Sequence, residues 1–297
     1  MADKILVTGA TGTVGSLLLD QLSGTGADFR ALVRNEAKAE KLRAGGVEVA
    51  QGDFEQPQTL APALEGIDRI FLLSTPGPEQ VRLQQNMIEA ARRAGVRRIV
   101  KLSAIGAGPD APTLLHDHYL IEQAIEQSGI AFTHLRPNGF MQNAFMFAHS
   151  IREQGVFYGS LRAAKVSYVD ARDIAAVAKA VLTEEGYDGK AFDITGPQAL
   201  SYDELAAEFS SVLGREVRYV DVSMEAVRAG MIGVGLSEWL ADALVGLFDF
   251  YREGSAAHVS NAVRRITGRE AMTFSQFAKD YAEAFQRSDE VGAQNAG

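Results

Sequence analysis

The chain has 297 residues, of which 46% are hydrophobic and 23% charged, a globular composition that excludes disordered, collagen-like and coiled-coil proteins. Acidic residues outnumber lysines and arginines by 38 to 29, and the net charge of −9 disfavours general binding to nucleic acid. The chain contains no cysteine, which excludes disulfides, thiolate nucleophiles and cysteine-ligated metals. We find neither an apolar run of the ~18 residues that span a membrane nor a signal peptide, and therefore expect a cytoplasmic protein without membrane contact.

Short β-branched runs alternate with longer amphipathic segments through the first half of the chain. Strands are predicted at residues 4–8, 29–33, 47–50, 69–73, 98–102 and 131–135. Helices are predicted between them, near residues 14–22, 37–44, 60–64, 79–94 and 115–127. This alternation indicates a parallel sheet with right-handed crossovers and helices on both faces, which is a doubly wound α/β fold of the Rossmann type.

The pattern changes after about residue 137. A strand at 165–169, a helix and a further strand are predicted up to residue 195. Helices then dominate, beginning where Ser201 and Glu204 have the spacing of a capping box and ending with one over 273–285. We therefore predict a first domain over 1–150 with its sheet completed within 165–195, a smaller, mostly helical C-terminal lobe over 196–290, and a frayed tail over 291–297.

The most informative segment is VTGATGTVG, in which Gly9, Gly12 and Gly15 follow the first predicted strand and open the first predicted helix. Gly9 permits a tight turn, Gly12 lets backbone N–H groups approach a pyrophosphate, and Gly15 lets the helix pack closely against the sheet. The helix N-terminus then faces the phosphates. This context favours an NAD(P)-binding first domain.

The end of the second predicted strand selects the cofactor. An NAD site usually carries an acidic residue there, whereas this chain has Arg34, whose planar guanidinium can pair with the 2′-phosphate of NADP(H). NADP(H) is therefore favoured over NAD(H), although Arg34 could also merely solvate the strand end. Asp53, after the third strand, could bind the adenine amine or cap an ordinary turn. Ser74 and Thr75 follow the fourth strand on the same carboxyl edge, where open α/β sheets bind ligands.

With these motifs, the chain resembles the NmrA-like group of atypical short-chain dehydrogenases/reductases over nearly its whole length. The group contains NADPH-dependent reductases of quinones, dyes and other small acceptors, and also redox-sensing regulators without evident catalysis. The blocks RPNGFMQN and VDARDIA are more specific to this group than the GATG turn is. The matching segments are VTGATGTVG (7–15), ALVRN (31–35), GDF (52–54), LSAIGA (102–107), SGIAFTHLRPNGFMQN (128–143), YVDARDIA (168–175) and DITGPQALSYDELA (193–206).

The resemblance implies which residues touch the cofactor. Pro137, Asn138 and Phe140 are implied to lie near the nicotinamide, and the C-terminal segments to form the smaller substrate lobe. Contacts with the rest of the cofactor are implied for Gly9, Thr11, Gly12, Thr13, Val14, Gly15, Arg34, Asp53, Phe54, Leu73, Ser74 and Thr75.

A cluster rich in phenylalanine and methionine follows the sixth predicted strand, over residues 140–147. Its side chains could line a pocket for a flat apolar acceptor, in which case Phe140, Asn143 and Phe147 would touch the substrate. The same residues could instead form core or dimer contacts.

Many members of the superfamily protonate their substrate with a Tyr-x-x-x-Lys pair, and this chain departs from that pattern, because Gln123 stands four residues after Tyr119. By similarity to the isoflavone- and lignan-type reductases, His118 occupies the position of the helix lysine and could supply a proton near neutral pH. Glu122 could orient its imidazole, or the two could form an ordinary surface pair. Ser103, after the fifth strand, could polarise a carbonyl or bond its own turn. His118, Tyr119 and Ser103 are therefore the candidate catalytic residues.

We predict an NADPH-dependent oxidoreductase that transfers a hydride to a small conjugated or aromatic acceptor, such as a quinone, an enone, a ketone or an azo compound. A quinone or azo acceptor can take its proton from water or a weak donor, so the missing Tyr/Lys pair does not exclude this activity. The alternative is a non-catalytic NADP(H)-binding redox sensor that acts through a protein partner. A sugar-nucleotide epimerase fits less well, because it would need the Tyr/Lys pair and basic contacts for a second pyrophosphate. We expect a monomer or homodimer, no nucleic-acid partner and no bound metal.

Overall fold

The computed structural model describes residues 3–287, which form two compact units that alternate along the chain. The first unit contains the chain up to residue 137, residues 171–194 and residues 262–269. The second contains residues 138–170, residues 195–261 and the chain from residue 270 onward. These limits differ from the predicted ones, because residues 138–150 group with the second unit. The tail predicted over 291–297 lies outside the described residues.

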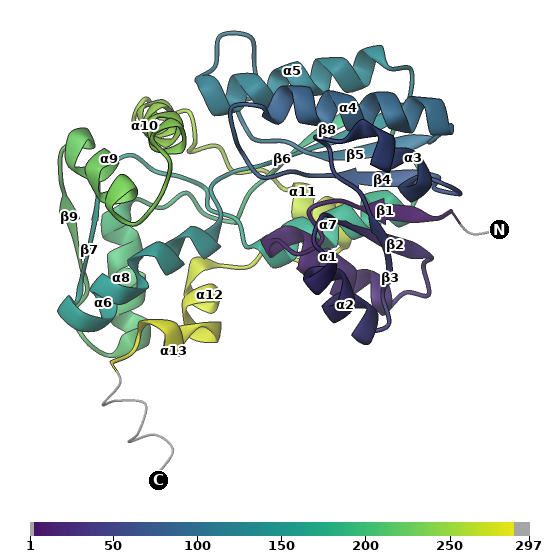
Figure 1. The fold of residues 1–297 in the computed structure, drawn as a ribbon. Coiled ribbons are helices and arrows are strands. Elements are labelled where there is room, and N and C mark those ends of the chain that lie inside the picture. The colour runs from purple at the N-terminus through teal and green to yellow at the C-terminus, as the bar shows by residue number, and fades with distance from the viewer. Residues whose placement is uncertain (1–2, 288–297) are drawn as a thin grey trace. The chain divides into compact units, whose positions relative to one another are not determined.

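The first unit is built on a seven-stranded sheet in which all neighbouring strands are parallel (Figure 1). Its spatial order is β3-β2-β1-β4-β5-β6-β8. The predicted Rossmann-type α/β fold is thereby confirmed, and the last strand comes from within residues 165–195 as expected. The strands are β1 (Ile5–Val7), β2 (Phe29–Val33), β3 (Glu48–Gln51), β4 (Arg69–Leu72), β5 (Arg98–Leu102), β6 (Ala131–Pro137) and β8 (Lys190–Ile194).

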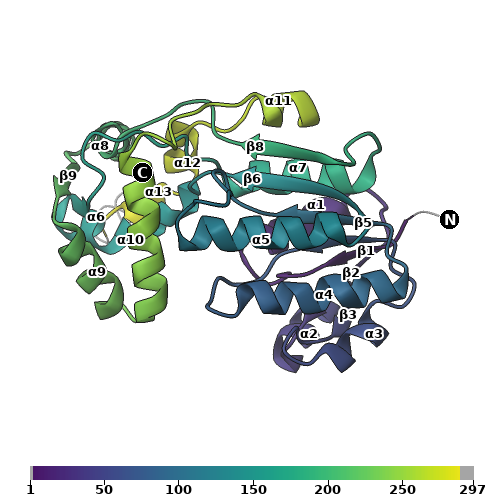
Figure 2. The same cartoon turned by 90° about the horizontal axis from the view of Figure 1, so that it is seen from above.

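Helices cover both faces of this sheet (Figures 1 and 2). One face carries α3 (Leu60–Ala63), α4 (Gln80–Ala94) and α5 (Thr113–Gln127). The other carries α1 (Thr13–Ser23), α7 (Ala171–Thr183) and α11 (Ala262–Thr267), while α2 (Glu36–Ala44) lies beside β3. On the first face, Ile70 and Ile99 of the sheet pack in one core with Met87 of α4 and Ile121 of α5. Strands that are covered on both faces are mostly apolar, and this pattern made it possible to predict them from the sequence.

The strand order reverses between β1 and β4, and ligands of open α/β sheets bind at the carboxyl ends of such a pair. Thr8, directly after β1, ties the two strand ends together. Its hydroxyl accepts a hydrogen bond from the Leu73 amide at 2.8 Å and lies within 3.0 Å of the Phe71 and Leu73 carbonyl oxygens, to one of which it donates. The edge of the sheet expected to carry the site is therefore held together by a buried side chain.

The opposite edge of the sheet is held by two buried arginines, Arg69 at the start of β4 and Arg98 at the start of β5. Both pair with the carboxylate of Glu185, which Arg98 reaches at 2.5 Å. Arg69 also donates to the Leu182 carbonyl at 2.7 Å, and Arg98 donates to the Glu184 carbonyl at 3.0 Å. Buried charged groups are costly unless they are paired and hydrogen-bonded, and here their partners hold the end of α7 against the sheet.

The second unit is mostly helical and has an aromatic core. Its small parallel sheet pairs β7 (Val156–Gly159) with β9 (Arg218–Asp221). Phe209 and Phe285 are fully buried, with ring centroids 4.7 Å apart. Ser201 and Glu204 form the predicted capping box at the start of α8. The helices of this unit are α6 (Ala148–Gln154), α8 (Tyr202–Leu213), α9 (Met224–Gly233), α10 (Glu238–Arg252), α12 (Phe274–Asp280) and α13 (Ala282–Phe285).

Two predicted elements were wrong. Residues 165–169 form no strand, because Val166 makes an antiparallel bridge and Val169 a parallel bridge to two different segments, so no continuous ladder develops. The helix predicted over 273–285 is divided at Tyr281, whose backbone angles (φ −115°, ψ 21°) leave the helical region. Within residues 3–287, no helix combines the length and apolarity needed to cross a bilayer, and no three His, Asp or Glu side chains could together hold a metal ion.

Candidate active site

The glycine turn after β1 has the geometry that its spacing predicts. Gly9 adopts a left-handed conformation (φ +61°), and its carbonyl accepts a hydrogen bond from the Gly12 amide at 2.9 Å. At Gly15, a Cβ would lie 2.7 Å from the Gly9 carbonyl carbon and 2.9 Å from the Ala10 Cα. Because these neighbours are backbone atoms, only glycine lets α1 start this close to the turn.

The N-terminus of α1 is open to an anion. Gly12 is the N-cap and provides no side chain for the free amides of the first turn, which contains no acidic residue. Thr11, Gly12 and Thr13 are exposed, whereas Val14 is buried beneath them. The unpaired amides and the positive end of the helix dipole therefore suit a phosphate group, and contacts of these four residues with the cofactor stay predictions.

Arg34 lies just beyond β2 and is exposed. Its neighbour Asn35 caps α2 by accepting hydrogen bonds from the Ala37 and Lys38 amides, which fixes the chain next to Arg34. Arg34 takes part in none of the ion pairs formed among residues 3–287. Its guanidinium is thus available to a ligand, although contact with a 2′-phosphate stays a prediction.

In the segments after β3 and β4, some of the predicted cofactor residues already form hydrogen bonds or core contacts within the protein. Asp53 Oδ1 accepts a hydrogen bond from the Glu55 amide at 3.0 Å, which supports its interpretation as a turn residue. The adjacent Phe54 is buried in the core. Ser74 accepts a hydrogen bond from Gln84 Nε2 at 2.9 Å, while Leu73 is half-buried and Thr75 is exposed. Contacts of these five residues with a cofactor stay predictions.

Residues at and after the end of β6 are held by hydrogen bonds to other parts of the chain. Pro137 ends β6, and its carbonyl accepts a hydrogen bond from Ile105 at 3.0 Å. In the second unit, the Asn138 amide nitrogen donates to Ser167 Oγ and the Ala256 carbonyl, each at 2.8 Å. Both of its hydrogens are therefore engaged, and its Oδ1 accepts a hydrogen bond from the Gly139 amide at 2.9 Å, so a cofactor could contact Asn138 only through the second lone pair of Oδ1 or through its backbone.

The three predicted substrate residues differ in their surroundings within the second unit. Phe147 stacks on Phe157 at 4.9 Å between ring centroids, so it belongs to the aromatic core. Phe140 is half-buried and bridges Val169, and Asn143 is exposed. The core interpretation therefore has direct support for Phe147, whereas substrate contacts of Phe140 and Asn143 stay predictions.

A buried lysine accompanies the predicted proton donor. His118 on α5 is partly buried, and its Nδ1 lies 3.1 Å from Nζ of Lys101 on β5. Lys101 is fully buried, and its ammonium also donates to the Leu102 carbonyl. Sequence reasoning sought a lysine four residues after Tyr119 and overlooked Lys101. The available signal was a lysine inside the apolar strand RIVKL, where a sheet covered on both faces leaves no solvent for a charge.

Glu122 does not hydrogen-bond to His118, as the spacing of the two residues had suggested. Its carboxylate instead accepts two hydrogen bonds from Arg136 of β6, at 2.9 Å to Nε and 2.5 Å to the terminal nitrogen. This bidentate pair competes with the imidazole for the carboxylate, and the Glu122 side chain is only 1% exposed.

Burial and charge act against each other in this cluster. Burial lowers the pKa of Lys101 to about 7, and the nearby charge of Glu122 only partly offsets this effect. Burial, together with the charge of Lys101, lowers the pKa of His118 well below its usual value. Burial opposes ionisation of Glu122 most strongly, but the hydrogen bonds from Arg136 and Ser103 and the charges of His134 and Arg136 together outweigh it and leave the pKa of Glu122 lowered. At neutral pH, the cluster thus combines a neutral imidazole, an ionised carboxylate and a lysine near half protonation.

Ser103 and Tyr119 are less closely linked to His118. The Ser103 hydroxyl is buried and has no partner at ordinary hydrogen-bond geometry, although it helps to lower the pKa of Glu122. Tyr119 is half-buried, with its ring 6.1 Å from that of His116. Neither side chain hydrogen-bonds to His118 among the described residues, so their catalytic roles stay predictions.

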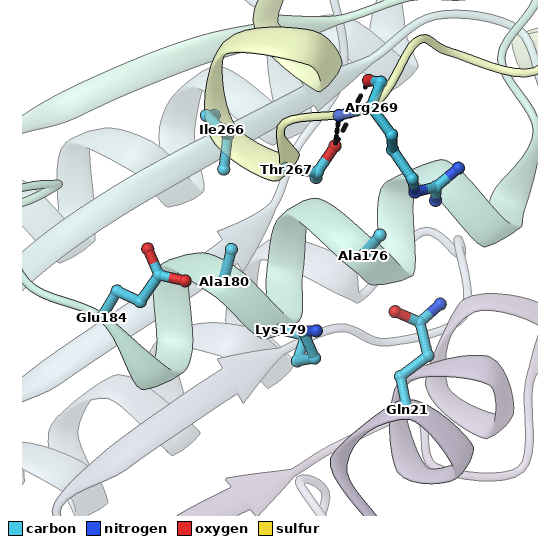
Figure 3. Close-up of a pocket in the computed structure, with 8 residues that line it drawn as sticks. All are labelled: Gln21, Ala176, Lys179, Ala180, Glu184, Ile266, Thr267 and Arg269. Atoms are coloured by element: carbon cyan, nitrogen blue, oxygen red, sulfur yellow. Dashed lines mark hydrogen bonds between the residues drawn. The ribbon is translucent and has the colours of Figure 1, made fainter. Parts of the chain in front are cut away.

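A hollow of about 360 Å³ lies elsewhere on the first unit, between α1, α7 and α11 (Figure 3). None of the predicted cofactor or catalytic residues lines it, and its helices cover the face opposite α4 and α5. We therefore place the candidate site at the carboxyl edge of the sheet and not at this hollow. Its lining comprises Gln21, Ala176, Lys179, Ala180, Glu184, Ile266, Thr267 and Arg269.

The parallel sheet, the glycine turn and the open N-terminus of α1 define a Rossmann-type α/β protein. The sequence model of the NmrA-like family matches residues 1–278, and the chain belongs to this family. The resemblance predicted from its motifs is thereby confirmed.

Similar proteins extend across almost the whole chain. An NAD(P)H azoreductase from Xenophilus azovorans is 45% identical over 283 residues, which cover 95% of this chain and 99% of the relative. The crystal structure of an NADPH-dependent quinone oxidoreductase from Escherichia coli, complexed with NADPH, matches with a TM-score of 0.86 and 31% identity over 93% of this chain and 99% of that one. Triphenylmethane reductase from Citrobacter sp., complexed with NADP(H), matches with a TM-score of 0.83 and 29% identity over the same shares.

Proposed function

We propose that this chain is an NADPH-dependent oxidoreductase that transfers a hydride to an azo or quinone acceptor. The observation that carries the proposal is the open N-terminus of α1, where exposed amides follow a glycine turn at the point at which the strand order reverses. The relatives include an NAD(P)H azoreductase and an NADPH-dependent quinone oxidoreductase, which supports the acceptor class.

The residues at this edge fit a dinucleotide phosphate. Gly9 and Gly12 would let a pyrophosphate approach the amides of α1, and Arg34 would pair with the 2′-phosphate. Residues 13–16 carry no acidic side chain that would repel either group. The protein is acidic as a whole, but this local set of amides and one arginine suffices to bind a polyanion.

Substitution of Arg34 by alanine is expected to raise the KM for NADPH roughly tenfold to hundredfold, which is the effect of losing hydrogen bonds between charged groups. The KM for NADH should stay unchanged, because NADH lacks the 2′-phosphate. Steady-state kinetics with both cofactors measure this difference. Arg43→Ala is the matched control, since Arg43 is exposed on α2 and pairs with Glu36. Equal changes in the KM values of both cofactors would contradict the selection of NADPH by Arg34.

The chain must supply one proton or admit one from solvent, because bound NADPH provides only a hydride. His118 is our proposed proton donor: it is only partly buried, and its low pKa leaves a neutral ring with one N–H group. Hydride transfer to a quinone leaves a stabilised phenolate, which can be protonated later by water. Hydride transfer to an azo group leaves a more basic nitrogen anion, which gains more from a donor within the site.

Substitution of His118 by alanine is expected to lower kcat for an azo dye roughly 100-fold, while kcat for a quinone changes less than about threefold. NADPH oxidation over a panel of azo, quinone, enone and ketone acceptors measures both rates. His116→Ala is the control, because His116 is half-exposed on the same helix and forms no ion pair among the described residues. Tight binding of NADPH without turnover of any acceptor would refute the reductase and favour the NADP(H)-binding regulator.

A further inference from the structure

A layer of polar side chains lies between the carboxyl ends of β5 and β6 and the helix α5. Lys101 comes from β5, His118 and Glu122 come from α5, and Arg136 comes from β6. The Glu122 carboxylate is occupied by Arg136, and no carboxylate lies within ion-pair distance of Lys101 among residues 3–287. Within the described part of the chain, the ammonium of this buried lysine therefore has two partners at hydrogen-bond distance, His118 Nδ1 and the Leu102 carbonyl.

The protonation of Lys101 determines the tautomer of the imidazole. While Lys101 is an ammonium group it has only N–H donors, so His118 Nδ1 accepts the hydrogen bond and the ring proton lies on Nε2. Lys101 is fully buried, whereas His118 is only partly buried. A proton that leaves Lys101 through this hydrogen bond therefore passes to the more accessible of the two groups.

We propose that Lys101 is a positioning residue that transfers its proton to His118 as His118 protonates the reduced acceptor. This inference rests on the proposed reductase function. The Nε2–H bond of His118 breaks as an N–H or O–H bond forms on the acceptor, and an Nζ–H bond of Lys101 breaks as Nδ1–H forms. The hydride and its electron pair come from NADPH, and solvent later restores the proton, so that one proton and one hydride are consumed in each cycle.

A purely structural role explains this lysine less well. A buried lysine with no carboxylate partner is unfavourable, and an apolar side chain of similar length would suit the interior better. Among the charged groups of the neighbouring elements, Glu122 acts on Lys101, while Glu126 on α5, His134 and Arg136 on β6 and Asp193 on β8 act on one another or on Glu122. Glu122 is engaged by Arg136, and Glu126 lies 3.2 Å from His134. Lys101 is thus the group best placed to return a proton to His118.

The relay predicts how turnover depends on pH. Its active form carries the ammonium, and burial lowers the pKa of Lys101 to about 7. Activity with an azo acceptor should therefore be full below this value and fall as the pH rises through it. Removal of Lys101 also removes a charge that lowers the pKa of His118, so any remaining inflection should reflect the histidine alone.

The test substitutes Lys101 by methionine in the full chain and measures NADPH-dependent turnover of an azo dye and of a quinone between about pH 5.5 and 9. We expect kcat for the azo dye to fall at least about tenfold at pH 7 and the inflection near pH 7 to disappear, while turnover of the quinone stays within about twofold. The variant should unfold at the same or a higher temperature, because it buries no lysine. Lys190→Met, at the exposed start of β8, is the control.

Two results would overturn the inference in distinguishable ways. If the unsubstituted protein turns over both acceptors and Lys101→Met keeps its pH profile, the relay is refuted and the proposed function stands. If the unsubstituted protein binds NADPH and turns over neither acceptor, the proposed function fails, and the relay fails with it. Nitrogen NMR of His118 gives a second readout, in which loss of Lys101 should move the titration of the ring to higher pH.

Discussion

Substitution of Gly15 by alanine is expected to lower the free energy of unfolding by about 3 kcal/mol and to weaken NADPH binding at least ~100-fold. The new Cβ would meet the backbone of Gly9 and Ala10 at 2.7 and 2.9 Å from their nearest carbon atoms. Neither atom can move without displacing the turn, so α1 must shift away and carry its free amides with it. Thermal unfolding and calorimetric titration with NADPH measure the two effects.

Gly24→Ala provides a matched control at the other end of the same helix. Gly24 has φ −80°, and its Cβ would meet only the Gln21 carbonyl oxygen, at 3.8 Å, which is ordinary contact. We expect this variant to bind NADPH as the unsubstituted protein does. A Gly15 variant that is as stable and binds as tightly as the Gly24 variant would show that the close approach of α1 is not required.

Substitution of Glu122 by alanine is expected to lower the free energy of unfolding by about 3 kcal/mol at pH 7, because it leaves buried positive charge unpaired. The Glu122 side chain is 1% exposed and accepts two hydrogen bonds from Arg136, and its charge also acts on Lys101. In the folded protein the pKa of Glu122 is lowered, so the pair stabilises fully above the ordinary carboxyl range and is lost as the pH falls through the lowered value. The two proteins should therefore differ at pH 7 and converge in acid.

Chemical unfolding at pH 7 and at about pH 3 checks this expectation. Glu126→Gln is the control. Glu126 stands one turn later on α5, and its side chain, which contacts His134, is 37% exposed. A pair of this kind contributes less than about 1 kcal/mol. Equal effects of the two substitutions at pH 7 would contradict the special role of the Glu122–Arg136 pair.

The fold could be predicted because its signals are local. The strand over 98–102 is apolar except for Arg98 and Lys101, which is a local pattern typical of a buried parallel strand. The three glycines of the turn have a spacing that few other structures require. Ser201 and Glu204 marked the start of α8 for the same reason, since a capping box involves only four consecutive residues.

The parts that escaped prediction depend on contacts between distant elements. Lys101 and His118 are 17 residues apart on different elements, and no spacing rule relates a strand to the helix that packs on it. Glu122 was expected to face His118 four residues earlier on the helix, but Arg136 of β6 provides a stronger partner. The Asn138 side chain is held by residues 167 and 256, which no local pattern could indicate.

The way in which the chain alternates between its two units restricts how proteins of this kind can change. The chain passes from one unit to the other five times, after residues 137, 170, 194, 261 and 269. Exchange of a single contiguous gene segment with a relative therefore cannot replace either unit as a whole. We expect ligand preferences in such proteins to change by point substitutions and short insertions. An engineered chimaera that replaces one whole unit would need five matched junctions.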